Sequence, residues 1–218
     1  MTRPPLDVPR LRRVPRQARS RERLARMLDA AEALLVAEGP AALTTTRVAG
    51  AAGVSVGSLY QYLPDKEAMV EALAGRYLAE FEGLMDALAE EASAAPERWT
   101  DPVGRLLDAF AQRYRDRPGY RALWFGREMT PSLRAADRDN KAALAAGLLR
   151  MLRELGVPDG PALETAARAG VLVADALLQE AFRADPRGEQ ALIEEAKRIL
   201  RLYLADVARG SGRSFTSA

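Results

Sequence analysis

The sequence predicts an all-α protein of about nine helices, in which a three-helix domain near the N-terminus is followed by a larger helical domain. Apolar residues recur at three- and four-residue intervals along every long segment, which is the period of one helix face. Clusters of proline and glycine separate these segments, as they do between packed helices. No convincing alternation of apolar and polar residues indicates a β-strand.

The first helix is predicted from about Arg16 or Ser20 to Glu38. Its apolar residues are spaced for one face, and Gly39-Pro40 ends the pattern. These apolar residues are Leu24, Met27, Leu28, Ala31, Leu34 and Leu35. The segment before this helix is rich in proline and arginine, so we expect a flexible basic arm there.

Two short helices follow. Thr44 is suited to cap a helix that Gly53 ends, and Ser55 is suited to cap a second one that Pro64 ends. Two short helices joined by a glycine-containing turn are typical of the helix-turn-helix, whose second helix enters the major groove of DNA. Leu59 and Leu63 lie one turn apart and are expected to pack inward.

Asp65 is suited to cap a fourth helix, and every later long segment has an amphipathic pattern. The breaks between these helices fall at Ala95-Pro96, Arg117-Pro118-Gly119, Thr130-Pro131, residues 156–161 and residues 185–188. We therefore predict an arm at 1–15, a helix-turn-helix domain at 16–66, a helical domain at 67–210 and a flexible tail at 211–218.

Composition narrows the possible chemistry. The 218 residues include no cysteine and no histidine, which excludes disulfides, thiolate nucleophiles, imidazole bases and zinc sites built on those ligands. Residues 1–66 carry a net charge of +5 and the remainder −3, so one end is suited to a polyanion. No secretion signal or membrane-spanning run is visible. We expect a cytoplasmic protein with no cofactor and no metal.

One stretch of the chain resembles the TetR/AcrR family of bacterial transcriptional repressors, most specifically between Arg19 and Leu73. The resemblance rests on the pattern Thr44-x-x-x-Val48-Ala49-x-x-Ala52-Gly53-Val54-Ser55-x-Gly57-Ser58-Leu59-Tyr60-x-Tyr62-x-Pro64-x-Lys66-Glu67. Two positions depart from the family pattern. Leu63 stands where the family generally has phenylalanine, and Val56 where many relatives have lysine or arginine. Beyond this stretch only the helical architecture and the length are similar.

A helix-turn-helix of this kind implies a set of DNA contacts. Hydroxyl and basic side chains at the ends of the short helices are suited to phosphates, and the outward side chains of the second helix to base edges. The predicted contacts are Thr44, Thr45, Arg47, Ser55, Val56, Gly57, Ser58, Tyr60, Gln61, Tyr62 and Lys66. The arginines of the arm could enter a minor groove, attract phosphates or simply be solvated.

The resemblance further implies a homodimer on a palindromic operator and a small-molecule effector bound in the C-terminal domain. The expected dimer contacts are Leu163, Ala167, Gly170, Ala174, Leu178, Leu192, Ala196, Ile199 and Tyr203. The expected ligand contacts are Phe110, Tyr114, Trp124, Phe125, Met151 and Asp175. Asp175 lies on an otherwise apolar strip, where it could pair with an arginine, lie at the dimer interface or bind a cationic ligand.

Two other functions stay open from the residues alone. An all-helical enzyme could bind a phosphorylated substrate through the basic end, but neither converging carboxylates nor a phosphate-binding glycine loop is visible. A helical scaffold could use the same end to dock a protein partner. The sequence favours a DNA-binding regulator without enzymatic activity over both.

Overall fold

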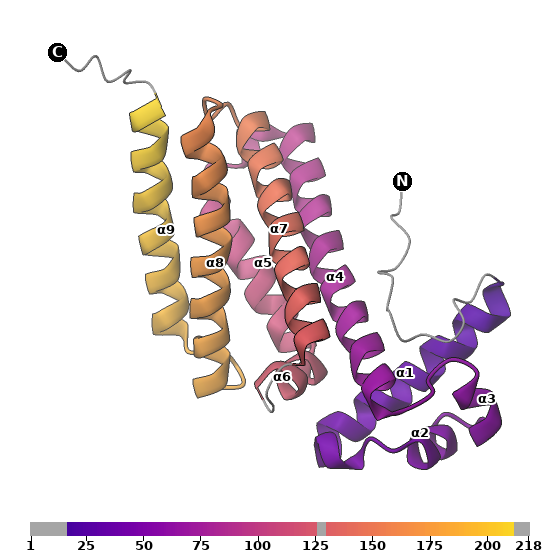
Figure 1. Cartoon of the computed structure of the whole chain (residues 1–218). Helices are drawn as coiled ribbons and strands as arrows, with labels where there is room; N and C mark the ends of the chain where they lie inside the picture. Colours follow the sequence, from indigo (N-terminus) through magenta and orange to yellow (C-terminus); the bar gives the residue numbers. More distant parts are fainter. Residues whose placement is uncertain (1–16, 126–129, 212–218) are drawn as a thin grey trace. The chain divides into compact units, whose positions relative to one another are not determined.

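The computed structural model describes residues 17–125 and 130–211 and is built of helices (Figure 1). Within these ranges there are nine α-helices, two 3₁₀ turns and no strand, which confirms the predicted all-α class. The α-helices are α1 (Ala18–Glu38), α2 (Thr45–Ala51), α3 (Val56–Tyr60), α4 (Lys66–Ala94), α5 (Pro102–Asp116), α6 (Pro118–Phe125), α7 (Pro131–Glu154), α8 (Pro161–Ala184) and α9 (Gln190–Ser211). The predicted arm at 1–15 and residues 212–218 of the predicted tail lie outside the described ranges.

Local sequence explains where the later helices begin. Each of α5, α6, α7 and α8 has proline as its first residue, a position where the missing N–H costs nothing and the fixed φ suits a helix. Side-chain caps support two of these starts. Asp101 Oδ1 accepts a hydrogen bond from Gly104 N at 3.1 Å, and Thr130 Oγ1 accepts one from Leu133 N at 3.2 Å.

Contacts between residues divide the chain into two compact units. The first comprises Met1–Ala79 and Arg117–Ala136, and the second comprises Glu80–Asp116 and Asp137–Ala218. The first unit therefore holds the helix-turn-helix, the first half of α4, all of α6 and the first residues of α7. The second holds the rest of α4 and α7 together with α5, α8 and α9.

The core of the first unit lies under α1. Met27, Leu28, Ala31 and Leu35 are buried along one face of this helix, as the spacing predicts. Helix α6 packs on the same helix. Its Tyr120 meets Tyr77 of α4 edge to face, with ring centroids 6.0 Å apart.

Gly119 allows α6 to approach α4 and α1 closely. A Cβ atom at this position would lie 2.1 Å from Tyr77 Oη and 2.8 Å from Glu32 Cγ. Arg76, next to Tyr77, bonds Asp29 at 2.6 Å and also pairs with Glu32. Burial and the Glu32 carboxylate raise the pKa of the Tyr77 phenol. Helices α1, α4 and α6 therefore pack so closely at Gly119 that no room is left for a larger residue there. We call this contact the junction at Gly119.

In the second unit α9 lies beside α8, and α5 contacts both (Figure 1). Aromatic rings pack together inside it: Phe81 lies 5.7 Å from Phe110 and 5.5 Å from Tyr114, and Tyr114 lies 5.1 Å from Phe182, measured between centroids. Within the described residues, no helix is long and apolar enough to span a membrane.

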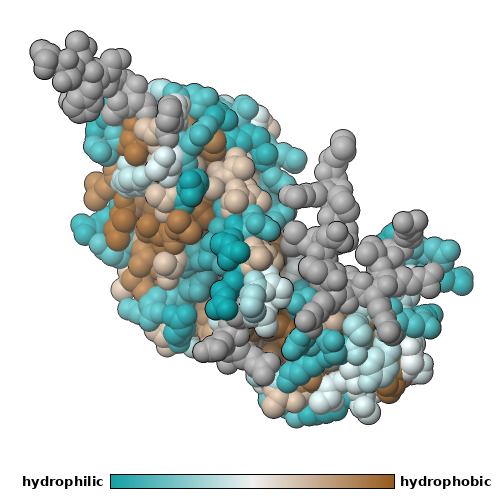
Figure 2. Space-filling view, in the orientation of Figure 1, coloured by the Kyte–Doolittle hydropathy of each residue, from teal (hydrophilic) through white to brown (hydrophobic). Residues whose placement is uncertain are grey.

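One apolar patch stays on the surface of the second unit. It is formed by five large side chains of α8 and α9, and Figure 2 shows brown, hydrophobic residues gathered where α9 lies in Figure 1. The α8/α9 patch consists of Leu172, Val173, Ile199, Leu202 and Tyr203. Leu202 is 63% exposed and Leu172 is 53% exposed. An exposed apolar patch of this kind indicates an interaction surface.

The close packing in the junction at Gly119 predicts that a second substitution, at Tyr77, partly restores the stability lost by a first one at Gly119. Gly119→Ala is expected to lower the free energy of unfolding by about 1–3 kcal/mol, because the added methyl group overlaps the Tyr77 hydroxyl. Adding Tyr77→Phe should recover part of that loss, since it removes the oxygen nearest the methyl. Urea denaturation of the two single variants and the double variant measures the coupling. Strictly additive effects would contradict the close packing.

Candidate nucleic-acid interface

Side-chain caps build the helix-turn-helix at the predicted positions. Thr44 Oγ1 accepts a hydrogen bond from Arg47 N at 3.3 Å at the start of α2, and Ser55 Oγ accepts one from Ser58 N at 3.1 Å at the start of α3. Asp65 Oδ1 accepts from Ala68 N at 2.7 Å at the start of α4. These caps confirm the local signals, because each satisfies a backbone N–H that the helix itself leaves unbonded.

The turn between α2 and α3 depends on Gly53. Its φ is 65°, in the left-handed region that costs glycine little and other residues more. The chain then reverses, and Val54 N donates to Ala49 O at 3.0 Å. This bond closes the end of α2, so the angle between the two short helices is set within a few residues.

Burial separates the two sides of α3. Leu59 and Leu63 are 0% exposed, as the one-turn spacing predicts. Gly57, Tyr60 and Gln61 are exposed. Val56 and Ser58 are half-buried at the edge of the same surface. The face predicted to contact bases is therefore open to solvent, and the opposite face is fixed in the core.

Tyr60 and Thr45 connect the two short helices on their outer side. The Tyr60 hydroxyl and Thr45 Oγ1 lie 3.3 Å apart, and Tyr60 is 41% exposed. The side chain of Tyr60 is therefore held by a hydrogen bond with Thr45 of α2 while part of its ring stays accessible. Such a ring is oriented before it meets a ligand, which reduces the entropy lost on binding.

Arg47, a predicted phosphate contact, is already paired in this structure. Its Nη2 lies 2.5 Å from Glu38 Oε1 at the end of α1, and both side chains are about half exposed. The hydrogen bond with Arg47 lowers the pKa of Glu38 and raises that of Arg47. Sequence analysis did not identify Glu38, because the pair spans the Gly39-Pro40 break and follows no helical spacing.

The structure places Tyr62 differently from the other predicted contacts. It is 3% exposed, so its ring belongs to the core beside Leu63 and we leave it out of the DNA-contact set. Thr44 and Ser55 are exposed, while Thr45 and Lys66 are half-buried. Thr44 and Ser55 also cap their helices, so each would contact DNA in addition to a structural role.

Comparison with known proteins decides the family. The family described as "Bacterial regulatory proteins, tetR family" matches residues 27–73, and "Tetracyclin repressor-like, C-terminal domain" matches residues 97–208. An uncharacterised HTH-type transcriptional regulator of Mycobacterium tuberculosis is 33% identical over 172 residues, covering 78% of this chain and 81% of the relative. The chain belongs to the TetR family of transcriptional regulators.

Solved structures agree with this assignment. A TetR-family transcriptional regulator from Streptomyces coelicolor matches with a TM-score of 0.60 and 32% identity, covering 86% of this chain and 98% of that one. The multidrug binding protein EbrR, complexed with imidazole, matches with a TM-score of 0.58 and 26% identity over 85% of this chain and 96% of that one. As a TetR-family member, the chain is a DNA-binding transcriptional regulator of a family that is generally non-enzymatic.

The predicted ligand residues fall in different places. Phe110, Tyr114 and Asp175 come together in the second unit, where Tyr114 Oη donates to Asp175 Oδ1 at 3.3 Å. Met151, in the same unit, is fully buried in α7. Trp124 and Phe125 belong to the first unit, where Trp124 stacks on Tyr120 at 4.4 Å between centroids.

Asp175 has a lysine partner that the sequence did not suggest. Lys141 Nζ of α7 lies 2.8 Å from Asp175 Oδ2 and 2.6 Å from Asp137 Oδ2, and Gln179 donates to Asp175 at 2.8 Å. Of the alternatives considered for Asp175, pairing with a cation of the same unit is observed, but the partner is a lysine and not an arginine. Desolvation lowers the pKa of Lys141, but the two carboxylates outweigh it and the net shift is upward. In the described part of the chain no acidic cluster is placed to hold a metal ion.

Most of the predicted dimer residues face the interior of their own unit, which corrects that prediction. Leu163, Ala167, Gly170, Leu178 and Ala196 are buried, because the facing stripes of α8 and α9 cover one another. Residues buried within their own unit cannot form the surface that contacts a second chain. Ala174 and Leu192 are half-buried, while Ile199 and Tyr203 are exposed and belong to the α8/α9 patch.

Removal of the Glu38 charge tests the role of Arg47. Glu38→Gln is expected to strengthen binding to a random-sequence duplex, because it frees the Arg47 guanidinium for phosphate and removes a repelling charge. The slope of log affinity against log salt should steepen by about 0.9, the value for one more neutralised phosphate.

Fluorescence anisotropy at several salt concentrations measures this slope. Glu195→Gln is the matched control, since Glu195 pairs with Arg198 in a similarly exposed contact on α9. An unchanged slope for Glu38→Gln would show that Arg47 does not bind phosphate.

Proposed function

We propose that this TetR-family regulator is a homodimeric repressor that binds a palindromic operator through α3, in the cytoplasm, and that a small-molecule effector releases it. The exposed face of α3 carries this proposal. Gly57, Tyr60 and Gln61 are open to solvent while Leu59 and Leu63 are fully buried, so the helix has one side for the protein and one for the major groove.

The chemistry of the side chains on this surface suits some of them to base edges and others to phosphates. Gln61 can pair with adenine in bidentate geometry, and the methyl groups of Val56 can contact a thymine methyl. Gly57 adds no side chain, so backbone can approach the groove. Arg47 and Lys66 carry charge without base selectivity and would fix the position of the domain on phosphates.

Substitutions at Gln61 and Lys66 should therefore differ in kind. Gln61→Ala is expected to relax preference at one base position, at a cost of about 1–3 kcal/mol on the preferred base. Lys66→Ala should weaken binding to all sequences similarly and reduce the salt slope by about 1. Both are measured on an operator selected from genomic fragments and on its single-base variants. A uniform effect of Gln61→Ala across those variants contradicts base contact by this residue.

The aromatic cluster around Tyr114 supports an effector site in the second unit. Packed aromatic rings beside one hydrogen-bonded carboxylate, Asp175, combine the apolar area and the orienting polar group typical of small-molecule sites. EbrR, which shares this fold at 26% identity, is a multidrug binding protein. An effector that binds the DNA-incompetent state more tightly would lower operator affinity, typically by ~1–3 kcal/mol.

The α8/α9 patch supports dimer formation. Leu172 and Leu202 are more than half exposed on neighbouring helices, and two copies related by a two-fold axis would cover this surface with a four-helix bundle. A dimer is also what a palindromic operator requires, because each half-site needs its own α3.

Charge placed in the patch tests this surface. Leu202→Arg is expected to raise the dimer dissociation constant about tenfold or more, since burial of an unpaired charge opposes association. Sedimentation velocity over a range of concentrations measures it. Ala142→Arg, at an exposed position of α7, is the control and should leave the dimer unchanged. Equal behaviour of the two variants would place the dimer interface elsewhere.

A further inference from the structure

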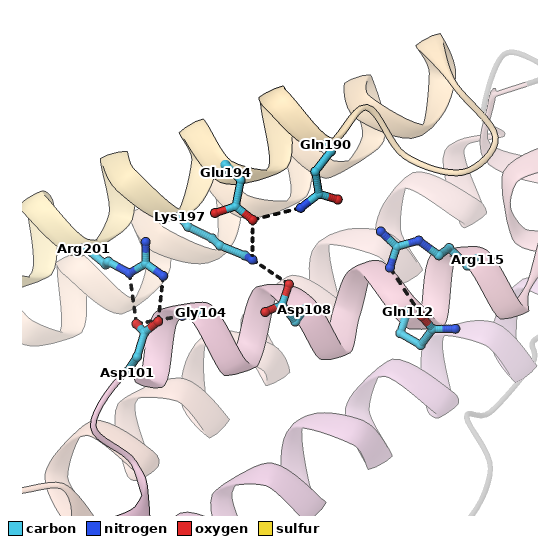
Figure 3. Close-up of polar contacts among 9 residues, drawn as sticks. All are labelled: Asp101, Gly104, Asp108, Gln112, Arg115, Gln190, Glu194, Lys197 and Arg201. Atoms are coloured by element: carbon cyan, nitrogen blue, oxygen red, sulfur yellow. Dashed lines mark hydrogen bonds and ion pairs between the residues drawn. The ribbon is translucent and has the colours of Figure 1, made fainter.

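A line of charged side chains joins α5 to α9 inside the second unit (Figure 3). At one end, Nε and Nη2 of Arg201 donate to the carboxylate of Asp101 at 3.0 and 2.6 Å. In the middle, Lys197 Nζ lies 2.6 Å from Asp108 Oδ1 and 2.8 Å from Glu194 Oε1. We call these five residues the α5–α9 seam.

The seam and one further contact, made by Arg115, keep a regular register along α5. Asp101, Asp108 and Arg115 are seven residues apart and so lie on one helix face. Arg115 Nε donates to the carbonyl oxygen of Arg187, before α9, at 2.9 Å. Asp101, just before α5, contacts Arg201, whereas Arg115, near the end of α5, contacts Arg187. The two segments therefore run antiparallel.

The Asp101–Arg201 pair is fitted closely. Asp101 also caps α5 through Gly104 N, and a Cβ atom on Gly104 would lie 2.1 Å from Asp101 Oδ2 and 2.9 Å from Arg201 Nη2. The hydrogen bond from Arg201 lowers the pKa of Asp101. A two-pronged bond between a guanidinium and a carboxylate fixes direction as well as distance.

Helix α9 needs such a directional contact because apolar side chains lie on much of its circumference. Ile193, Ala196 and Leu200 are buried, while Ile199 and Leu202 are exposed on another side. Burial of apolar surface is non-directional, so a modest rotation of α9 would exchange one apolar group for another at small cost. At 100° per residue, Ile199 and Leu202 lie on the side of the helix away from Lys197 and Arg201.

We propose that the α5–α9 seam fixes the rotation of α9 about its own axis and thereby selects Ile199, Leu202 and Tyr203 as the face offered to a second copy of this chain. This inference rests on the proposed homodimer. The five seam residues are positioning residues, which act on the dimer through the orientation of α9.

The seam can be neutralised without leaving a buried charge. Lys197 is 5% exposed, but its partners Asp108 and Glu194 have side chains 63% and 52% exposed. After Lys197→Met those carboxylates are solvated, and the methionine keeps the apolar volume of the lysine stem. The double variant Lys197→Met/Arg201→Met removes both bridging cations and retains apolar bulk at both positions.

The absence of cysteine from the sequence gives a direct readout. In a Leu202→Cys background, the introduced thiol is the one thiol of the chain, and its reaction with a maleimide reports whether position 202 is covered. We expect protection in the dimer. Adding Lys197→Met/Arg201→Met should speed labelling about tenfold, because the combined free energy of two surface ion pairs corresponds to about that factor. Helix content, measured by circular dichroism, should stay unchanged.

Two further variants separate positioning from general stability. Arg150→Met removes a 2.7 Å ion pair with Asp86, between α7 and α4 of the same unit, and should leave the labelling rate unchanged. Lys197→Arg keeps the charge and should keep the protection. High salt should speed labelling in the Leu202→Cys background and have little effect once the seam is neutralised.

The outcomes distinguish this inference from the proposed function. If the chain with Leu202→Cys sediments as a monomer, as does the unaltered chain, the homodimer itself is wrong and the role of the seam with it. If the chain is a dimer but Cys at 202 labels as fast as in a monomer, the selected face is wrong. If the seam-neutralised dimer labels as slowly as its parent, the seam does not orient α9.

Discussion

The burial of Leu59 and Leu63 is the constraint on which the proposed DNA-binding surface depends. Helix α3 has only five residues, too few to be stable by its own hydrogen bonds. Leu59 within the helix and Leu63 just after its end are fully buried and anchor it to the core, and Ser55 caps its start. Since these contacts leave α3 one orientation, they also decide that Gly57, Tyr60 and Gln61 face outward.

Helix α9 meets the same problem of orientation with different chemistry. Its apolar residues are spread too widely for burial alone to define one rotation, and an antiparallel line of ion pairs to α5 supplies the missing direction. In α3 buried apolar residues leave polar side chains exposed on the proposed DNA-binding face, whereas in α9 ion pairs are proposed to orient an exposed apolar face.

The candidate DNA interface could be derived largely from local sequence. The caps at Thr44, Ser55 and Asp65 and the turn at Gly53 depend on residues no more than five positions apart, and all are present. Burial of Tyr62 and the pairing of Glu38 with Arg47 could not be derived in this way. Both depend on how α1 and the short helices pack, which no spacing within one helix records.

The sequence by itself determined the all-α class, the order of the helices and the places where they begin, because prolines, caps and a period of 3.6 residues act within one or two turns. Only the tertiary structure decided what covers each apolar stripe. Leu163, Ala167 and Ala196 are buried within their own unit, whereas Leu202 and Tyr203 remain outside. An amphipathic pattern indicates that one face of a helix is buried. Because the hydrophobic effect is non-directional, the pattern does not specify which other surface covers that face.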